Sequence, residues 1–197
     1  MDSSRTISRA SHLLSTRVLL ICAALAAVQV GLYLALAPVL VGLPAISPPL
    51  YAVVAGAHST MIFLTPRVTG ARGAATITAL IAGLIIAAMS PIGLFVTLLI
   101  LVPGVMIDLA LLVPGASTPR VTELRYLGAA MTAAIVLFLV SLPAFSAEHL
   151  TTWILVGAAV GRVAGETIAY VCARALAAGL ARAGIRRAEP GTGQRVR

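Results

Sequence analysis

Four ionisable side chains lie inside apolar stretches of this sequence, and they are the residues best suited to hold a polar solute. They are His58, Asp108, Arg162 and Glu166. Burying a charged side chain at the centre of a bilayer costs a few kcal/mol even on lenient insertion scales, so such residues commonly mark solute paths or ion pairs. We therefore treat all four as candidate binding residues.

Each candidate also has a structural interpretation. Arg162 and Glu166 are four residues apart, which places them on one face of a helix, where they form either a structural ion pair or the polar wall of a binding site. Asp108 is expected either to pair with an arginine near the membrane interface or to contact a ligand. His58 either hydrogen-bonds a neighbouring helix or contacts a ligand.

Two aromatic residues are further candidates. Tyr51 and Trp153 fall at the predicted outer ends of their helices. Aromatic residues at such positions usually anchor a protein at the membrane interface. Either ring could instead stack on a planar solute.

A stripe of small residues marks the first apolar segment. Ala23, Ala27, Gly31 and Ala35 follow one another at intervals of four residues. Small residues at this spacing let another helix approach closely. The stripe predicts a helix contact, either within the bundle or with a partner protein.

The composition places these residues in a membrane protein. Of the 197 residues, 60% are hydrophobic and only 10% are charged, and the mean hydropathy is +1.05. A water-soluble domain carries about 25% charged residues. All 14 basic residues are arginines and most of them lie between the apolar runs, which is typical of membrane orientation signals and not of a nucleic-acid interface.

The apolar runs predict an all-α membrane protein, a bundle of six transmembrane helices. We expect the helices at residues 18–41, 50–64, 74–89, 94–113, 126–142 and 153–180, and a proline-rich loop at residues 42–49. The domain organisation is then a basic segment at residues 1–17, a transmembrane domain at 18–180 and a basic, disordered tail at 181–197.

The arginines also predict the orientation of the chain. With the N-terminus in the cytoplasm, the arginines of the termini and connecting segments fall in cytoplasmic segments, and the outer loops contain none. Positively charged residues are enriched in cytoplasmic loops. We therefore expect both termini in the cytoplasm and a multi-pass protein of the bacterial plasma membrane.

Several catalytic classes lack their signatures here. The chain has no lysine, so it has no phosphate-binding lysine of a P-loop ATPase. It contains no HExxH and no GxSxG motif. Its three histidines and two cysteines are too dispersed to predict a metal site. We expect no enzyme activity, no cofactor and no metal.

Short motifs carry a resemblance to a known family. Pro49-Leu50-Tyr51 opens the second predicted helix, Gly73-Ala74-Ala75 opens the third, and a small-residue and acidic pattern, from Gly104 to Asp108-Leu109, lies on the fourth. With six short helices and a basic tail, the chain resembles the substrate-binding S components of energy-coupling factor (ECF) vitamin transporters. The Ala23, Ala27 and Gly31 stripe is similar to the motif by which S components dock on a transmembrane T subunit.

The resemblance implies a function. It is strongest to the subgroup linked to thiamine and its hydroxymethylpyrimidine precursor, and a subgroup of unassigned substrate fits nearly as well. It implies a vitamin-sized solute bound near the outer surface, with a T subunit and two ATPase subunits as partners. Glu166 would offset the charge of a thiamine-like ligand, Arg162 would hold that carboxylate, and Tyr51 and Trp153 would stack on a ring.

Two other function classes remain open. One is a structural or assembly membrane protein that uses the small-residue stripe and the basic tail to hold partners. The other is an intramembrane enzyme, which would require His58 with Ser59, or Asp108, to be catalytic.

Overall fold

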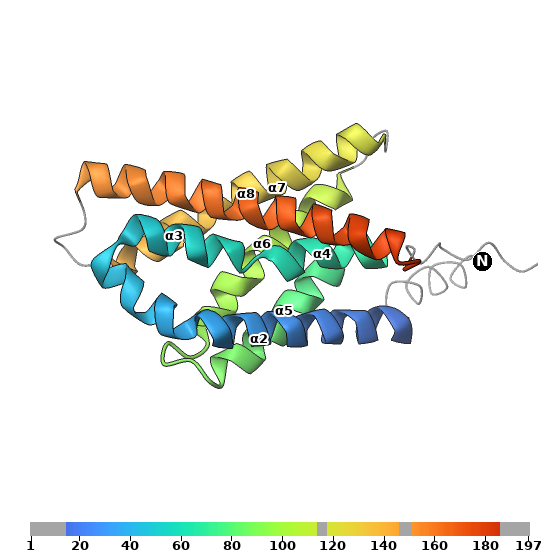
Figure 1. Ribbon diagram of the computed structural model, residues 1–197, viewed down its shortest axis with the longest axis horizontal. Helices are drawn as coiled ribbons and strands as arrows, with labels where there is room; N and C mark the ends of the chain where they lie inside the picture. Colours follow the sequence, from blue (N-terminus) through green and yellow to red (C-terminus); the bar gives the residue numbers. More distant parts are fainter. Residues whose placement is uncertain (1–14, 114–117, 146–150, 186–197) are drawn as a thin grey trace, which may run out of the picture.

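A computed structural model describes residues 15–113, 118–145 and 151–185, and these ranges contain helices and no strand (Figure 1). The helices are α2 (Thr16–Ile46), α3 (Pro48–Ala57), α4 (Thr60–Thr69), α5 (Ala74–Ala87), α6 (Phe95–Leu112), α7 (Pro119–Ser141), the short 3-10 helix η1 (Leu142–Ala144) and α8 (Thr152–Arg182). Most of the predicted basic segments at the two termini lies outside the described residues.

The predicted six-helix membrane fold is confirmed. Helices α3 and α4 follow one another as a single broken rod, and with α2, α5, α6, α7 and α8 they make a bundle of six rods (Figure 1). Helices α2, α6, α7 and α8 are long and apolar enough to cross a membrane. Large apolar side chains are exposed on the outside of the bundle, where lipid would solvate them, among them Leu20, Val28, Leu98 and Ile135.

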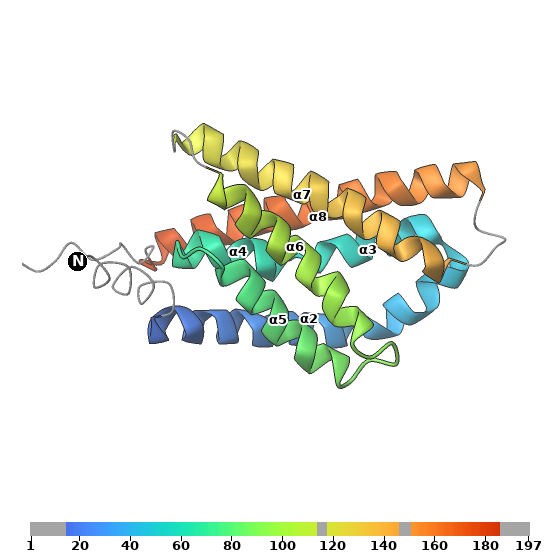
Figure 2. The same cartoon turned by 180° about the vertical axis from the view of Figure 1, so that it is seen from behind.

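The arginines gather at one end of the bundle. Both figures place the start of α2 and the end of α8 at the same end (Figures 1 and 2). Seven of the eight described arginines lie in or near that end: Arg17, Arg67, Arg72, Arg120, Arg125, Arg174 and Arg182. We call it the arginine end. The remaining one, Arg162, lies in the other half of the bundle.

The predicted loop at residues 42–49 is wrong. Helix α2 continues to Ile46 with Pro38 and Pro44 inside it, and only Ser47 separates it from α3. Pro48 and Pro49 occupy the first turn of α3, where a missing backbone N–H costs nothing. The prolines bend and start helices here and do not form a loop.

Other helix bounds also differ from the prediction. The expected helix at 50–64 is broken at His58 and Ser59, and its second part, α4, continues to Thr69. The expected start of the fifth helix at residue 126 is seven residues late, because α7 begins at Pro119 with the Thr118 hydroxyl accepting a hydrogen bond from the Val121 N–H. A threonine cap followed by proline is a strong helix-start signal.

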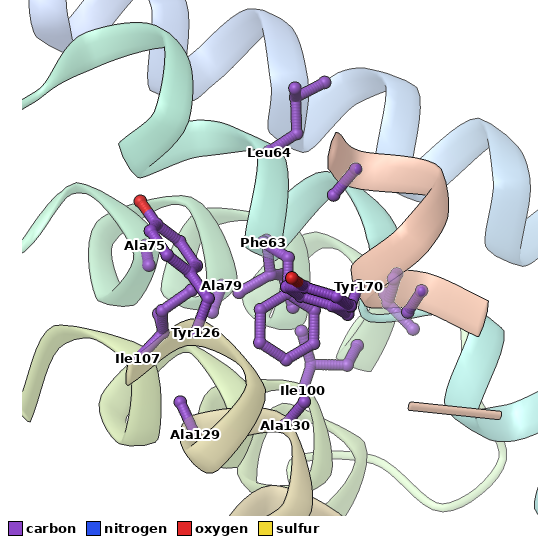
Figure 3. Packing of buried hydrophobic residues seen from close by; sticks show 14 of the residues in the cluster. Phe63, Leu64, Ala75, Ala79, Ile100, Ile107, Tyr126, Ala129, Ala130 and Tyr170 are labelled. Atoms are coloured by element: carbon purple, nitrogen blue, oxygen red, sulfur yellow. The ribbon is translucent and has the colours of Figure 1, made fainter. Parts of the chain in front are cut away.

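Small residues set the distances between rods. Helix α3 packs along α8 on a seam of glycines, where a Cβ on Gly161 would lie 2.5 Å from the Pro49 carbonyl oxygen and one on Gly165 would collide with the Val53 carbonyl oxygen. We call this contact the glycine seam. The central core is filled by larger rings, with Phe63, Tyr126 and Tyr170 beside Ile107 and several alanines (Figure 3).

Candidate functional site

A cavity of about 330 Å³ lies between the helices in the half of the bundle away from the arginine end. The residues around it are mostly apolar, with hydroxyl groups, one imidazole and one guanidinium among them. They are Tyr33, Leu40, Val41, Pro44, Tyr51, Ala55, His58, Ser59, Ile62, Ser90, Pro91, Ile92, Phe95, Val96, Leu99, Ile100, Pro103, Leu137, Ser141 and Arg162. A pocket of this size and composition is typical of a small-molecule site.

The helix break between α3 and α4 supplies part of the polar wall. At this break the hydroxyl of Thr60 donates to the Ala57 carbonyl oxygen at 2.7 Å, and the Ser59 N–H donates to the Gly56 carbonyl oxygen at 3.0 Å. Hydroxyl groups that bond to nearby backbone groups compete with regular helix bonds. His58 and Ser59, the two residues at the break, both line the cavity.

Arg162 lies at the cavity and Glu166 lies behind it. The Arg162 Nε is 4.0 Å from the Glu166 Oε1, and the same oxygen accepts a hydrogen bond from the Ser59 hydroxyl at 3.0 Å. Glu166 has no exposed surface, and Arg162 is one of the cavity-lining residues. The predicted pair therefore exists, and its cation is the member that faces the cavity.

The pair is incompletely satisfied. Neither the Arg162 Nε nor the Glu166 Oε2 has a hydrogen-bond partner among the described residues. A charged group in a low-dielectric surrounding gains much from each hydrogen bond. This cluster therefore has hydrogen-bonding capacity to spare beside the cavity.

His58 and Tyr51 complete the group of predicted residues that the structure brings together. The His58 Nδ1 lies 3.4 Å from the Val54 carbonyl oxygen, and within the described chain its Nε2 has no partner. The ring of Tyr33 meets that of His58 edge to face, with centroids 5.7 Å apart. Tyr51, His58 and Arg162 thus line one cavity.

Trp153 and Asp108 do not belong to this cavity. Trp153 is 85% exposed at the start of α8. Asp108 accepts hydrogen bonds from the backbone N–H groups of Gly73 and Thr76 and from the Thr76 hydroxyl, at 3.1, 2.8 and 2.7 Å. The expected arginine partner is absent from the described contacts of Asp108, which instead caps the start of α5.

The small-residue stripe of α2 faces outward. Ala23, Ala27, Gly31 and Ala35 are exposed, and no heavy atom lies within 4 Å of a Cβ built on Gly31. Cys22 and Ala26, which are fully buried, form the inward face of the same helix. The stripe is therefore free to contact another molecule.

A second charged cluster, which sequence reasoning missed, lies near the arginine end. Arg67 binds both carboxylate oxygens of Glu123 at 2.8 and 3.0 Å, and the Tyr170 hydroxyl donates to Glu123 at 2.8 Å. The Arg67 guanidinium also stacks 3.9 Å above the Tyr126 ring. This cluster ties α4, α7 and α8 together and lies outside the cavity.

Comparisons with known proteins bear on the fold. Comparison with protein-family models gives no match, and comparison with curated protein sequences gives no significant one. A solved structure described as an S-component of ECF transporter matches with a TM-score of 0.68 and 21% sequence identity, over 87% of each chain. The fold is that of an S component. The predicted resemblance is confirmed at the level of this fold.

Proposed function

We propose that this protein is the membrane-embedded substrate-binding subunit of an ECF-type importer for a vitamin or vitamin precursor. The observation that carries the proposal is the cavity lined by Tyr51, His58 and Arg162 in a chain with the S-component fold. Buried polar residues around a mostly apolar pocket can both hold and orient a small heterocycle. Thiamine and hydroxymethylpyrimidine are the first ligands to test.

The proposal includes a division of labour among subunits. The subunit would bind its solute without catalysis, in the plasma membrane of a bacterium, and with both termini in the cytoplasm the cavity would lie in the outer half of the bilayer. A T subunit and two ATPase subunits would provide the driving force. The outward stripe of Ala23, Ala27 and Gly31 supports docking of the T subunit on α2, because small residues let a second helix approach closely.

A binding screen tests the proposal. The full chain, purified into lipid nanodiscs, is examined by thermal shift against B vitamins and their precursors and by native mass spectrometry for a co-purified ligand. We expect one heterocycle to raise the unfolding temperature, since a ligand that binds only the folded state stabilises it. No stabilisation by any of these compounds and no co-purified ligand would favour the alternative, a structural or assembly protein.

Two matched variants locate the site. Tyr51→Ala removes a ring at the cavity, and we expect the affinity for the ligand found in the screen to fall by about tenfold, or about 1.4 kcal/mol. Trp153→Ala removes an exposed ring outside the cavity, and we expect unchanged affinity. Loss of affinity in Trp153→Ala alone would move the binding site away from the cavity.

A further inference from the structure

The charge that faces the cavity restricts the class of ligand that it can hold. Among the described residues that line the cavity, Arg162 is the only arginine and none is a carboxylate. Its side chain is 9% exposed and comes from α8. Every ligand in this cavity must therefore be compatible with a nearby guanidinium.

Glu166 is the ion-pair partner of Arg162, but its carboxylate does not line the cavity. The carboxylate is fully buried, its Oε1 accepts a hydrogen bond from the Ser59 hydroxyl, and Glu166 is not among the described residues that line the cavity. With Glu166 ionised, the pair contributes no net charge, so the cavity does not require an anion to neutralise it. A cationic ligand would meet Arg162 and not Glu166, and like charges in a poorly screened site repel each other.

The Arg162 guanidinium also has N–H groups available to donate hydrogen bonds to a ligand. Its ion pair with Glu166 is long, at 4.0 Å, and within the part of the chain that the structure describes no hydrogen bond from Arg162 to another residue is found. Arginine has five N–H donors and no acceptor. A ligand group that accepts hydrogen bonds would satisfy these donors.

We propose that the cavity selects an uncharged heterocycle that presents a hydrogen-bond acceptor to Arg162, and that Arg162 discriminates against cations of the same shape. This inference rests on the proposed function and narrows its substrate class. Of the two first candidates, it favours the neutral hydroxymethylpyrimidine over thiamine, which carries a permanently charged thiazolium ring.

The decisive comparison uses ligands that differ in charge and hardly in shape. Thiamine is compared with its analogue in which an uncharged thiophene replaces the thiazolium, and hydroxymethylpyrimidine is measured alongside. Binding is followed by isothermal titration calorimetry of the full chain in nanodiscs, in mildly alkaline buffer where the aminopyrimidine is neutral. We expect the thiophene analogue to bind about tenfold more tightly than thiamine.

Variants of the pair assign the effect to Arg162. Arg162→Lys keeps the cation and is expected to keep the preference. Because removing one partner alone would leave a buried, unpaired carboxylate, the charge is removed with the double variant Arg162→Gln and Glu166→Gln. In this variant the affinities for thiamine and the thiophene analogue are expected to agree within about twofold, because the repulsion is gone.

Three results would overturn the inference. They are tighter binding of thiamine than of its uncharged analogue, an unchanged preference in a double variant that still elutes and unfolds as the wild type does, and no binding of any of the three compounds. The first two results would contradict only the inferred ligand class and would not contradict the proposed function as an importer subunit. After the third result, the proposed function is tested separately by the screen against the other vitamins.

Discussion

Three carboxylates inside this bundle differ in how completely their hydrogen-bonding capacity is met. Asp108 accepts three hydrogen bonds, and Glu123 accepts three from Arg67 and Tyr170. Glu166, which lies next to the cavity, has one hydrogen bond and a long ion pair. The well-satisfied carboxylates hold helices in place, and the least satisfied one lies at the candidate site.

The role of Asp108 can be tested by Asp108→Asn. The amide keeps one acceptor oxygen but loses the charge that favours the start of α5, so we expect a loss of about 1–2 kcal/mol in the free energy of unfolding. Thermal unfolding in detergent measures it. Thr76→Ser keeps the hydroxyl group and serves as the control, with little change expected. Reduced ligand affinity with normal stability in Asp108→Asn would instead make Asp108 a ligand contact.

At this scale, the sequence indicated some contacts and concealed others. The four-residue spacing of Arg162 and Glu166 indicated a shared face, because helical geometry is local. The hydrogen bond from Ser59 to Glu166 joins residues 107 positions apart, and no local pattern encodes it. The exposure of Trp153 agrees with the interfacial anchor that its position at a helix end indicated, and not with the alternative of a ring inside the cavity.

The contact between α3 and α8 is governed by backbone atoms. Gly56, Gly161 and Gly165 let the two helices approach so closely that a Cβ on any of them would lie less than 3.0 Å from a backbone atom of the other helix. The spacing of Gly157, Gly161 and Gly165 was visible in the sequence as a small-residue repeat typical of tight helix pairs. Only the stripe on the first helix was predicted to make a helix contact, and the glycine repeat on α8 was missed.

Two glycines of α8 provide a matched test of the glycine seam. Gly165→Ala inserts a methyl group against the Val53 carbonyl oxygen, and such overpacking is expected to cost about 1–3 kcal/mol and to weaken ligand binding by shifting Arg162. Gly179→Ala adds the same group to the same helix in open space, and is expected to be neutral or stabilising by up to about 1 kcal/mol.

The stability of the two glycine variants is compared by thermal unfolding, and their ligand affinity is compared by titration. Equal effects of the two substitutions would mean that helix propensity, and not close packing on α3, decides the outcome.

In the described part of the chain, seven of the eight arginines lie in or near one end of the bundle, and the cavity lies in the other half. This polarity was largely predictable, because apolar runs of membrane-spanning length and intervening arginines report how often and in which direction a chain crosses the bilayer. The prolines misled the prediction at residues 42–49, since a proline in the first turn of a helix and one in a loop look alike in sequence.

The predicted orientation can be measured by cysteine labelling. Cys22 and Cys172 are replaced by alanine, and single cysteines are introduced as Ser8→Cys, Met89→Cys and Thr192→Cys. We expect an impermeant maleimide to label Met89→Cys in intact cells, because Met89 is exposed at the end opposite the arginines. The two terminal variants should react only after lysis. Labelling of one terminal cysteine in intact cells would contradict the six-pass topology.

The glycine seam determines where the cavity can open. One wall carries Tyr51 and His58 on the α3 side, and the other carries Arg162 on α8, and their backbones already touch. Separating α3 from α8 would break the close packing along the glycine seam, so we do not expect a solute to pass between these two helices. We expect the entrance at the part of the lining that is exposed, which includes Val41 of α2, Ile92 and Phe95, so that a solute enters without moving Arg162 or His58.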